Sequence, residues 1–297
     1  MKLKLTLIAL AATALMSTSA VAADEIQAVF HYPAGGGVDS STAALWTAIE
    51  KTSDARVKKI YYKSCAEAMD HVAKTPNSLL VTESGAVNLD GATTRCPDAR
   101  KAGMQLVSLV TSSSGYLCTA PGKTNLTVQD LLGNRSLKVG AGKHPTTSGV
   151  AEAFLKDIGS KSRVIPYANV AELRASAAAG DVDMVYGVNG IAELVAAGSK
   201  CLAASSSDNP RKLPALSTFT KSPFPSFYLS TAVFTVHPND KITSTIQRAM
   251  RSVEFQQDID RRQVIHLGLG TTNTVKQQEQ IYRNDYQTGV GFESKTK

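Results

Sequence analysis

Short apolar runs alternate with amphipathic stretches along the first part of the chain. Runs rich in β-branched, aromatic and aliphatic residues are typical of strands, whereas apolar positions spaced three or four residues apart are typical of helices. We therefore predict strands at 27–32, 57–62, 78–81, 104–111 and 116–119, and helices at 40–51 and 66–74.

The same alternation begins again after Pro121-Gly122. Here we predict strands at 137–139, 163–166, 184–186 and 201–204, and helices at 147–158, 170–179 and 191–197. Asn169 is placed to cap the helix that begins at residue 170. A proline-rich, polar stretch then predicts a long connection at 208–225, followed by a strand at 227–236 and helices at 242–251, 256–262 and 275–283.

This alternation predicts an α/β fold with mixed, mostly parallel sheets. The two restarts, near Pro121 and near Phe227, predict two lobes with the second inserted into the first. We expect residues 23–120 and 223–297 to form the first lobe, with the C-terminal helices, and residues 121–222 to form the second. No fixed-period repeat is present, which excludes solenoids and propellers.

The first 22 residues have the pattern of a cleavable signal peptide. Lys2 and Lys4 precede an uncharged apolar stretch at 5–16, and Ala20-Val21-Ala22 supplies the small residues of a cleavage site. An N-terminal membrane anchor is the weaker interpretation, because the apolar run is too short to span a bilayer core of about 30 Å. We expect export to the periplasm, with cleavage after Ala22 or Ala23.

The charge distribution bears on the kind of partner. The formal net charge is +7, and removing the two lysines of the signal peptide leaves +5. The basic residues are scattered and aromatic residues are few, which argues against a nucleic-acid partner. A mildly positive cleft would instead concentrate an anionic ligand.

Four cysteines follow the signal peptide: Cys65, Cys96, Cys118 and Cys201. An even number in an exported protein predicts two disulfides. Three pairings are possible, and order along the chain favours Cys65 with Cys96 and Cys118 with Cys201. No pair has Cys-x-x-Cys spacing, which disfavours a zinc ribbon and thioredoxin-type chemistry.

A glycine-rich loop between the first predicted strand and helix is the first candidate site. Glycines allow close approach of backbone to ligand, and a helix start adds free N–H donors and partial positive charge. A capped strand-to-helix turn explains the same residues equally well. The predicted ligand contacts are Tyr32, Pro33, Ala34, Gly35, Gly36, Gly37, Val38, Asp39 and Ser40.

A second loop, at 140–149, repeats this arrangement in the other predicted lobe. It is no nucleotide P-loop, because Lys138 replaces the required glycine and His144 stands at the Ser/Thr position. The predicted ligand contacts here are Gly142, Thr146, Thr147 and Ser148. Tyr186 and Asn189 are added because they lie where a predicted strand ends, which is where open α/β sheets bind ligands, although a buried strand with a polar turn explains them too.

Catalytic signatures are missing from the sequence. There is no Gly-x-Ser-x-Gly elbow, and the five histidines are dispersed without helical metal-ligand spacing. We therefore predict no catalytic residue, no metal ligand and no cofactor. A spatially assembled triad is not visible in a sequence, so an unfamiliar periplasmic hydrolase stays an alternative.

Residues 32–39, Tyr-Pro-Ala-Gly-Gly-x-x-Asp, resemble the opening motif of the Bug family, the extracytoplasmic solute receptors of tripartite tricarboxylate transporters. Similar segments follow at 140–149, 179–184, 197–203 and 268–270. The resemblance implies a type II periplasmic-binding fold, with two lobes joined by hinge strands. It also implies that the first glycine loop holds a ligand carboxylate, faced by Thr146, Thr147 and Ser148 from the other lobe.

The function implied by this resemblance is capture of a small carboxylate or other organic anion for membrane transporter subunits of the tripartite tricarboxylate type. A monomer is expected for this architecture, and ligand sensing for a membrane signalling partner is an alternative that uses the same cleft. The chain departs from the family at 61–67, where a second glycine loop is replaced by residues that include Lys63 and Cys65. That departure leaves the ligand class open.

Overall fold

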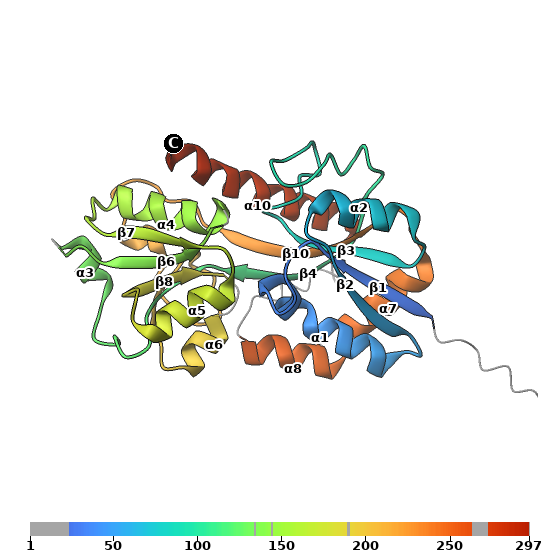
Figure 1. The fold of residues 1–297 in the computed structure, drawn as a ribbon, viewed down its shortest axis with the longest axis horizontal. Coiled ribbons are helices and arrows are strands. Elements are labelled where there is room, and N and C mark those ends of the chain that lie inside the picture. Colours follow the sequence, from blue (N-terminus) through green and yellow to red (C-terminus); the bar gives the residue numbers. More distant parts are fainter. Residues whose placement is uncertain (1–23, 134, 144, 189–190, 263–272, 297) are drawn as a thin grey trace, which may run out of the picture.

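The computed structural model describes residues 24–133, 135–143, 145–188, 191–262 and 273–296 (Figure 1). Two five-stranded sheets lie side by side along the long axis, each with its own helices. The sheet order is β2-β1-β3-β10-β4 in the first lobe and β7-β6-β8-β5-β9 in the second. Among the described residues, no helix is long and apolar enough to cross a membrane.

The first lobe is a sheet covered by helices on both faces. Its strands are β1 (Glu25–Phe30), β2 (Arg56–Tyr61), β3 (Ser78–Glu83), β4 (Gln105–Ser114) and β10 (Tyr228–Thr235). Its helices are α1 (Gly37–Thr52), α2 (Cys65–Lys74), α7 (Asp240–Met250) and α8 (Val253–Arg262). Trp46 and Phe255 pack in the core on one face and Met69 in the core on the other, so β3 is buried along its whole length.

The second lobe repeats this layering. Its strands are β5 (Tyr116–Thr119), β6 (Lys138–Gly142), β7 (Arg163–Tyr167), β8 (Met184–Gly187) and β9 (Cys201–Ala204). Its helices are α3 (Val128–Leu132), α4 (Pro145–Asp157), α5 (Val170–Ala179) and α6 (Ile191–Ala196). Leu131 and Phe154 pack on one face and Leu173 and Leu194 on the other. The chain enters this sheet through β5, before residue 121.

The predicted α/β fold of two lobes with mixed sheets is confirmed. In each sheet two neighbouring pairs are parallel and two are antiparallel, because one strand, β10 in the first sheet and β5 in the second, runs against the other four. The predicted cap is confirmed too, since the backbone N–H of Glu172 donates to Asn169 Oδ1 at 2.9 Å. Helix α3 was not predicted, although Thr127 and Asp130 form a capping box at its start.

Two strands connect the lobes at a hinge held together by Ser205. The chain passes from β4 into β5 through Gly115, whose N–H donates to Ser205 Oγ at 2.7 Å. Ser205 Oγ also donates to the carbonyl oxygen of Phe227, just before β10, at 2.6 Å. The two crossing strands are therefore joined through one buried hydroxyl.

The last helix, α10 (Val275–Thr296), spans both lobes. Tyr282 packs in the core of the first lobe and Phe292 in the core of the second. The helix extends past residue 283, where the sequence pattern predicted its end, because its second half packs against α4. Helix α10 therefore connects the two lobes in addition to the hinge strands.

We expect Gly115→Ala to destabilise the protein by about 1–3 kcal/mol, the usual cost of overpacking. A Cβ atom at position 115 would lie 2.0 Å from the hydroxyl oxygen and 2.5 Å from the Cζ of the buried Tyr186. Urea unfolding measures the loss. Gly91→Ala is the control, since its Cβ would meet nothing closer than Asn88 Nδ2 at 3.6 Å. Equal stability of the two variants would contradict the packing described for the hinge.

Both disulfides join the cysteines that order along the chain favoured. Cys65, at the start of α2, is bonded to Cys96, and Cys118 in β5 is bonded to Cys201 in β9. The first bridge fixes the loop that follows β3 to the first lobe, whereas the second lies within the sheet of the other lobe.

Candidate ligand-binding cleft

A cavity of about 130 Å³ lies between the two lobes. From the first lobe it is lined by Tyr32, Pro33, Gly36, Gly37, Val38, Glu83, Arg95 and Leu229. From the second it is lined by Gly142, Thr147, Ala168, Asn169, Val170, Leu173, Gly187 and Val188. A space of this size suits a small metabolite rather than a drug-sized molecule.

The glycine loop brings the start of α1 to this cavity. Gly35 adopts a left-handed φ of +72°, which favours glycine. The loop closes with a hydrogen bond from Gly36 N–H to the carbonyl oxygen of Pro33 at 3.0 Å. Gly36 caps α1 and Gly37 is its first residue, so the positive end of the helix faces the cavity.

Asp39 does not line the cavity, although it was a predicted ligand contact. Its carboxylate accepts hydrogen bonds from Lys59 Nζ at 2.7 Å, Gly35 N–H at 2.9 Å and the Tyr61 hydroxyl at 2.9 Å. Burial alone would raise the pKa of Asp39, but these hydrogen bonds outweigh it and lower the pKa. Asp39 therefore stabilises the conformation of the glycine loop without lining the cavity.

We expect Asp39→Asn to cost about 1.5–3 kcal/mol of stability at pH 7, because charged hydrogen bonds are lost. The folded-state pKa of Asp39 lies below that of the unfolded chain, about 3.9. The contribution of the carboxylate is thus fully present above pH 4 and is lost as the pH falls through the folded pKa. The free energies of unfolding of wild type and variant, measured by urea titration, should become equal only in acid.

Asp70→Asn is the matched control for that variant. The Asp70 carboxylate pairs with Lys74 on the exposed surface of α2, and such pairs contribute at most about 1 kcal/mol. A difference between wild type and Asp39→Asn that stays constant from pH 7 to pH 3 would contradict the described role.

Two further helix starts face the cavity from the second lobe. Thr147, in the first turn of α4, donates from Oγ1 to the carbonyl oxygen of Gly142 at 2.9 Å. Asn169 and Val170 bring in the start of α5. Asn169 was predicted only as a helix cap, yet the turn from β7 to α5 is a third strand-to-helix loop of the same kind.

The predicted contacts divide into two groups. Those that line the cavity are Tyr32, Pro33, Gly36, Gly37, Val38, Gly142 and Thr147. Those that lie outside its lining are Ala34, Gly35, Asp39, Ser40, Thr146, Ser148 and Tyr186. Thr146 is turned toward Gly289 of α10, and Tyr186 is buried beside Gly115. Asn189 lies outside the described residues.

The cavity lining also includes two charged residues that no sequence pattern indicated. Glu83 ends β3, and burial raises its pKa to about 7 against the opposing effects of the Arg95 charge and the Tyr32 hydroxyl. Arg95 comes from the loop after β3. Neither residue stands in a motif, and only the folded chain brings them together.

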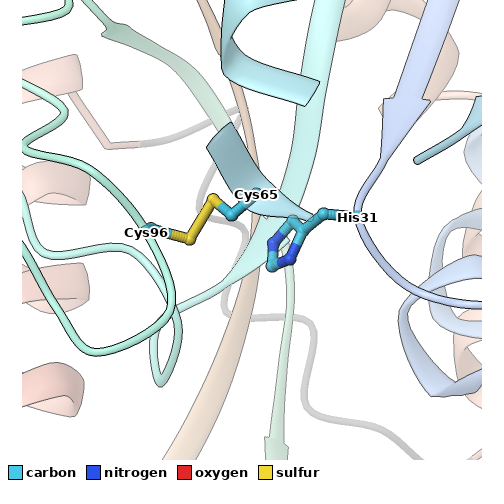
Figure 2. A group of neighbouring side chains, drawn as sticks. All are labelled: His31, Cys65 and Cys96. Atoms are coloured by element: carbon cyan, nitrogen blue, oxygen red, sulfur yellow. A yellow bond between two sulfur atoms is a disulfide. The ribbon is translucent and has the colours of Figure 1, made fainter. Parts of the chain in front are cut away.

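The Cys65–Cys96 bridge fixes the loop that carries Arg95 (Figure 2). Within the loop, Thr93 Oγ1 donates to the carbonyl oxygen of Ala86 at 2.9 Å and accepts from Cys96 N–H at 2.8 Å. The bridge thus holds an arginine at the cavity.

His31 lies beside this bridge (Figure 2). Burial and the Arg95 charge lower the pKa of His31 to about 4, so the ring is neutral at pH 7. The ligand atoms of His31, Cys65 and Cys96 lie within 4.8 Å of one another, but the two sulfurs are bonded together and are not thiolates. In this oxidised form the group offers a metal only the imidazole.

No family model matches the chain, and no curated protein matches its sequence. Solved structures do match. The periplasmic binding protein BugD gives a TM-score of 0.69 at 14% identity, covering 91% of this chain and 96% of BugD. MatC from Rhodopseudomonas palustris, solved with bound malate, gives 0.70 at 13% identity, covering 91% and 99%. Rpa4515 from R. palustris, solved with adipate, gives 0.72 at 16% identity, covering 91% and 97%.

Identities this low establish the fold alone. The chain has the two-lobed α/β fold of periplasmic binding proteins, as the motif at 32–39 implied.

Proposed function

We propose that this protein is an exported solute-binding receptor of the Bug type, which closes its lobes on a small organic anion in the periplasm. The observation that carries this proposal is the convergence of three helix starts and one arginine on a single interlobe cavity. Gly37, Thr147 and Val170 mark the first turns of α1, α4 and α5, and Arg95 adds a full positive charge. Helix N-termini and arginine are the common protein partners of carboxylates.

Two further observations support the proposal. Two disulfides suit an oxidising compartment such as the periplasm. MatC and Rpa4515, which share the fold, were solved with malate and adipate, both organic anions. We further propose that the loaded receptor delivers its ligand to membrane subunits of the tripartite tricarboxylate type and acts as a monomer.

A binding role without catalysis suits the chemistry of the lining. Among the described residues that line the cavity there is no histidine, serine or cysteine. The hydroxyl of Thr147 is engaged with the Gly142 carbonyl. The nearby His31 has a pKa of about 4, which makes it a weak general base at pH 7.

A thermal-shift screen of the mature protein against carboxylates, amino acids and phosphate compounds tests this function. The protein is first unfolded and refolded to remove any bound metabolite. A ligand at 100 times its Kd stabilises the folded state by about 2.7 kcal/mol, a rise in Tm of about 5–10 °C. We expect one class of anion to give this rise and to be recovered unchanged. Conversion of the compound, or no shift with any anion, contradicts the proposal.

A further inference from the structure

Glu83 and Arg95 place opposite charges in the same small cavity. The backbone of Glu83 is fixed, since its carbonyl oxygen accepts from the Tyr282 hydroxyl at 2.9 Å and from Ala86 N–H at 3.0 Å. Only 6% of Glu83 is exposed. The carboxyl group therefore stays at the cavity and does not swing out to solvent.

The positive groups of the cavity and the carboxyl group of Glu83 attract different chemical groups of a ligand. The starts of α1, α4 and α5, together with Arg95, attract a carboxylate. Glu83 repels a second carboxylate, because two carboxylates in one low-dielectric site cannot both stay charged at little cost. Its oxygens accept readily from an ammonium or hydroxyl group instead.

Most of the remaining lining side chains are apolar and suit a short hydrocarbon skeleton between the two ends of a ligand, with Tyr32, Thr147 and Asn169 as polar exceptions. The apolar side chains are Val38, Val170, Leu173, Val188 and Leu229. These apolar residues cannot pair with a polar group of the ligand, so they favour a hydrocarbon middle with the charged and donor groups at its ends.

Taking the proposed function as given, we propose that Glu83 selects the ligand class. The preferred ligand is a short carboxylate that also carries a hydrogen-bond donor, an ammonium or a hydroxyl group, and unsubstituted dicarboxylates are rejected. Glu83 is thus a specificity-determining residue, and Arg95 and the helix starts supply the general affinity for anions.

Calorimetric titration of the stripped protein at pH 8 with matched pairs of compounds tests this assignment. One set pairs ω-amino or ω-hydroxy carboxylates of three to six carbons with dicarboxylates of the same length. A second set pairs 2-amino or 2-hydroxy carboxylates with the unsubstituted acids. We expect the donor-bearing member of the best-bound pair to bind at least ten-fold more tightly.

Glu83→Gln is the informative variant, because its amide donates to a carboxylate. We expect it to weaken the donor-bearing ligand and to tighten the paired dicarboxylate, so that the preference falls below about three-fold. Glu152→Gln, on the exposed face of α4, removes the same charge away from the cavity and should leave the preference unchanged.

Three results overturn the assignment. A dicarboxylate that binds wild type as tightly as its partner shows that Glu83 does not select against it. Equal weakening of both ligands by Glu83→Gln shows that the residue merely positions Arg95. If Glu83→Gln fails to fold, the affinities of wild type for the paired compounds still test the assignment. No binding by any compound overturns the proposed function as well, so the two failures are distinguishable.

Discussion

Arg95→Gln is expected to weaken binding of the organic anion by at least 30-fold while changing stability little. Arg95 supplies the full positive charge of the cavity lining, and its loss would leave the charge of the enclosed anion without this partner, which costs about 2–5 kcal/mol. Its charge also opposes the rise in the pKa of Glu83, so the variant protonates Glu83 more fully at pH 7. The residue itself is exposed, and its removal leaves no cavity in the core.

Arg100→Gln is the control, because Arg100 lies on the same loop and pairs with Asp90 away from the cavity. Calorimetry gives Kd and urea unfolding gives stability for both variants. Equal affinity of Arg95→Gln and Arg100→Gln would place the anion elsewhere. A large loss of stability in Arg95→Gln would assign the arginine to the fold instead.

Removal of the Cys65–Cys96 bridge by serine substitution is expected to lower both stability and affinity. The bridge closes a sequence separation of 31 residues, for which chain entropy predicts about 3.5–4 kcal/mol. The loop that it fixes carries Arg95, so a looser loop adds an ordering cost to binding. We expect Kd to rise at least ten-fold.

Removal of the Cys118–Cys201 bridge separates the two effects. It closes a separation of 83 residues, for which the same relation predicts about 4.5 kcal/mol. The bridge lies between β5 and β9, so we expect a larger loss of stability with Kd nearly unchanged. Equal effects of the two removals on Kd would show that the first bridge does not organise the cavity.

The fold was largely predictable because its elements are specified locally. Helix α5 occupies the predicted range behind its Asn169 cap, since capping and the glycine at position 180 are local signals. The end of α10 was not predictable in the same way. Residues beyond 283 are helical because Gly289 fits closely against Thr146 and Phe292 enters the core of the second lobe, and both contacts are tertiary.

The lining of the candidate cavity could be predicted where a strand runs into a helix, and not elsewhere. Pro33, Gly36 and Thr147 lie on such turns and line the cavity. Arg95 reaches the cavity only because a disulfide joins its loop to α2, and the sequence alone left three pairings open. Asp39 was predicted as a ligand contact because it stands at a helix start beside the glycine loop. Its partners Lys59 and Tyr61 come from β2, which only sheet pairing brings alongside β1, so the sequence did not show that its carboxylate is engaged within the fold.

The most direct test is a crystal structure with the anion that the screen identifies. We predict that its carboxylate lies between the lobes, within hydrogen-bonding distance of the Gly37 and Val38 amides and the Arg95 guanidinium. An anion bound outside this cavity, or contacting only one lobe, would contradict this prediction.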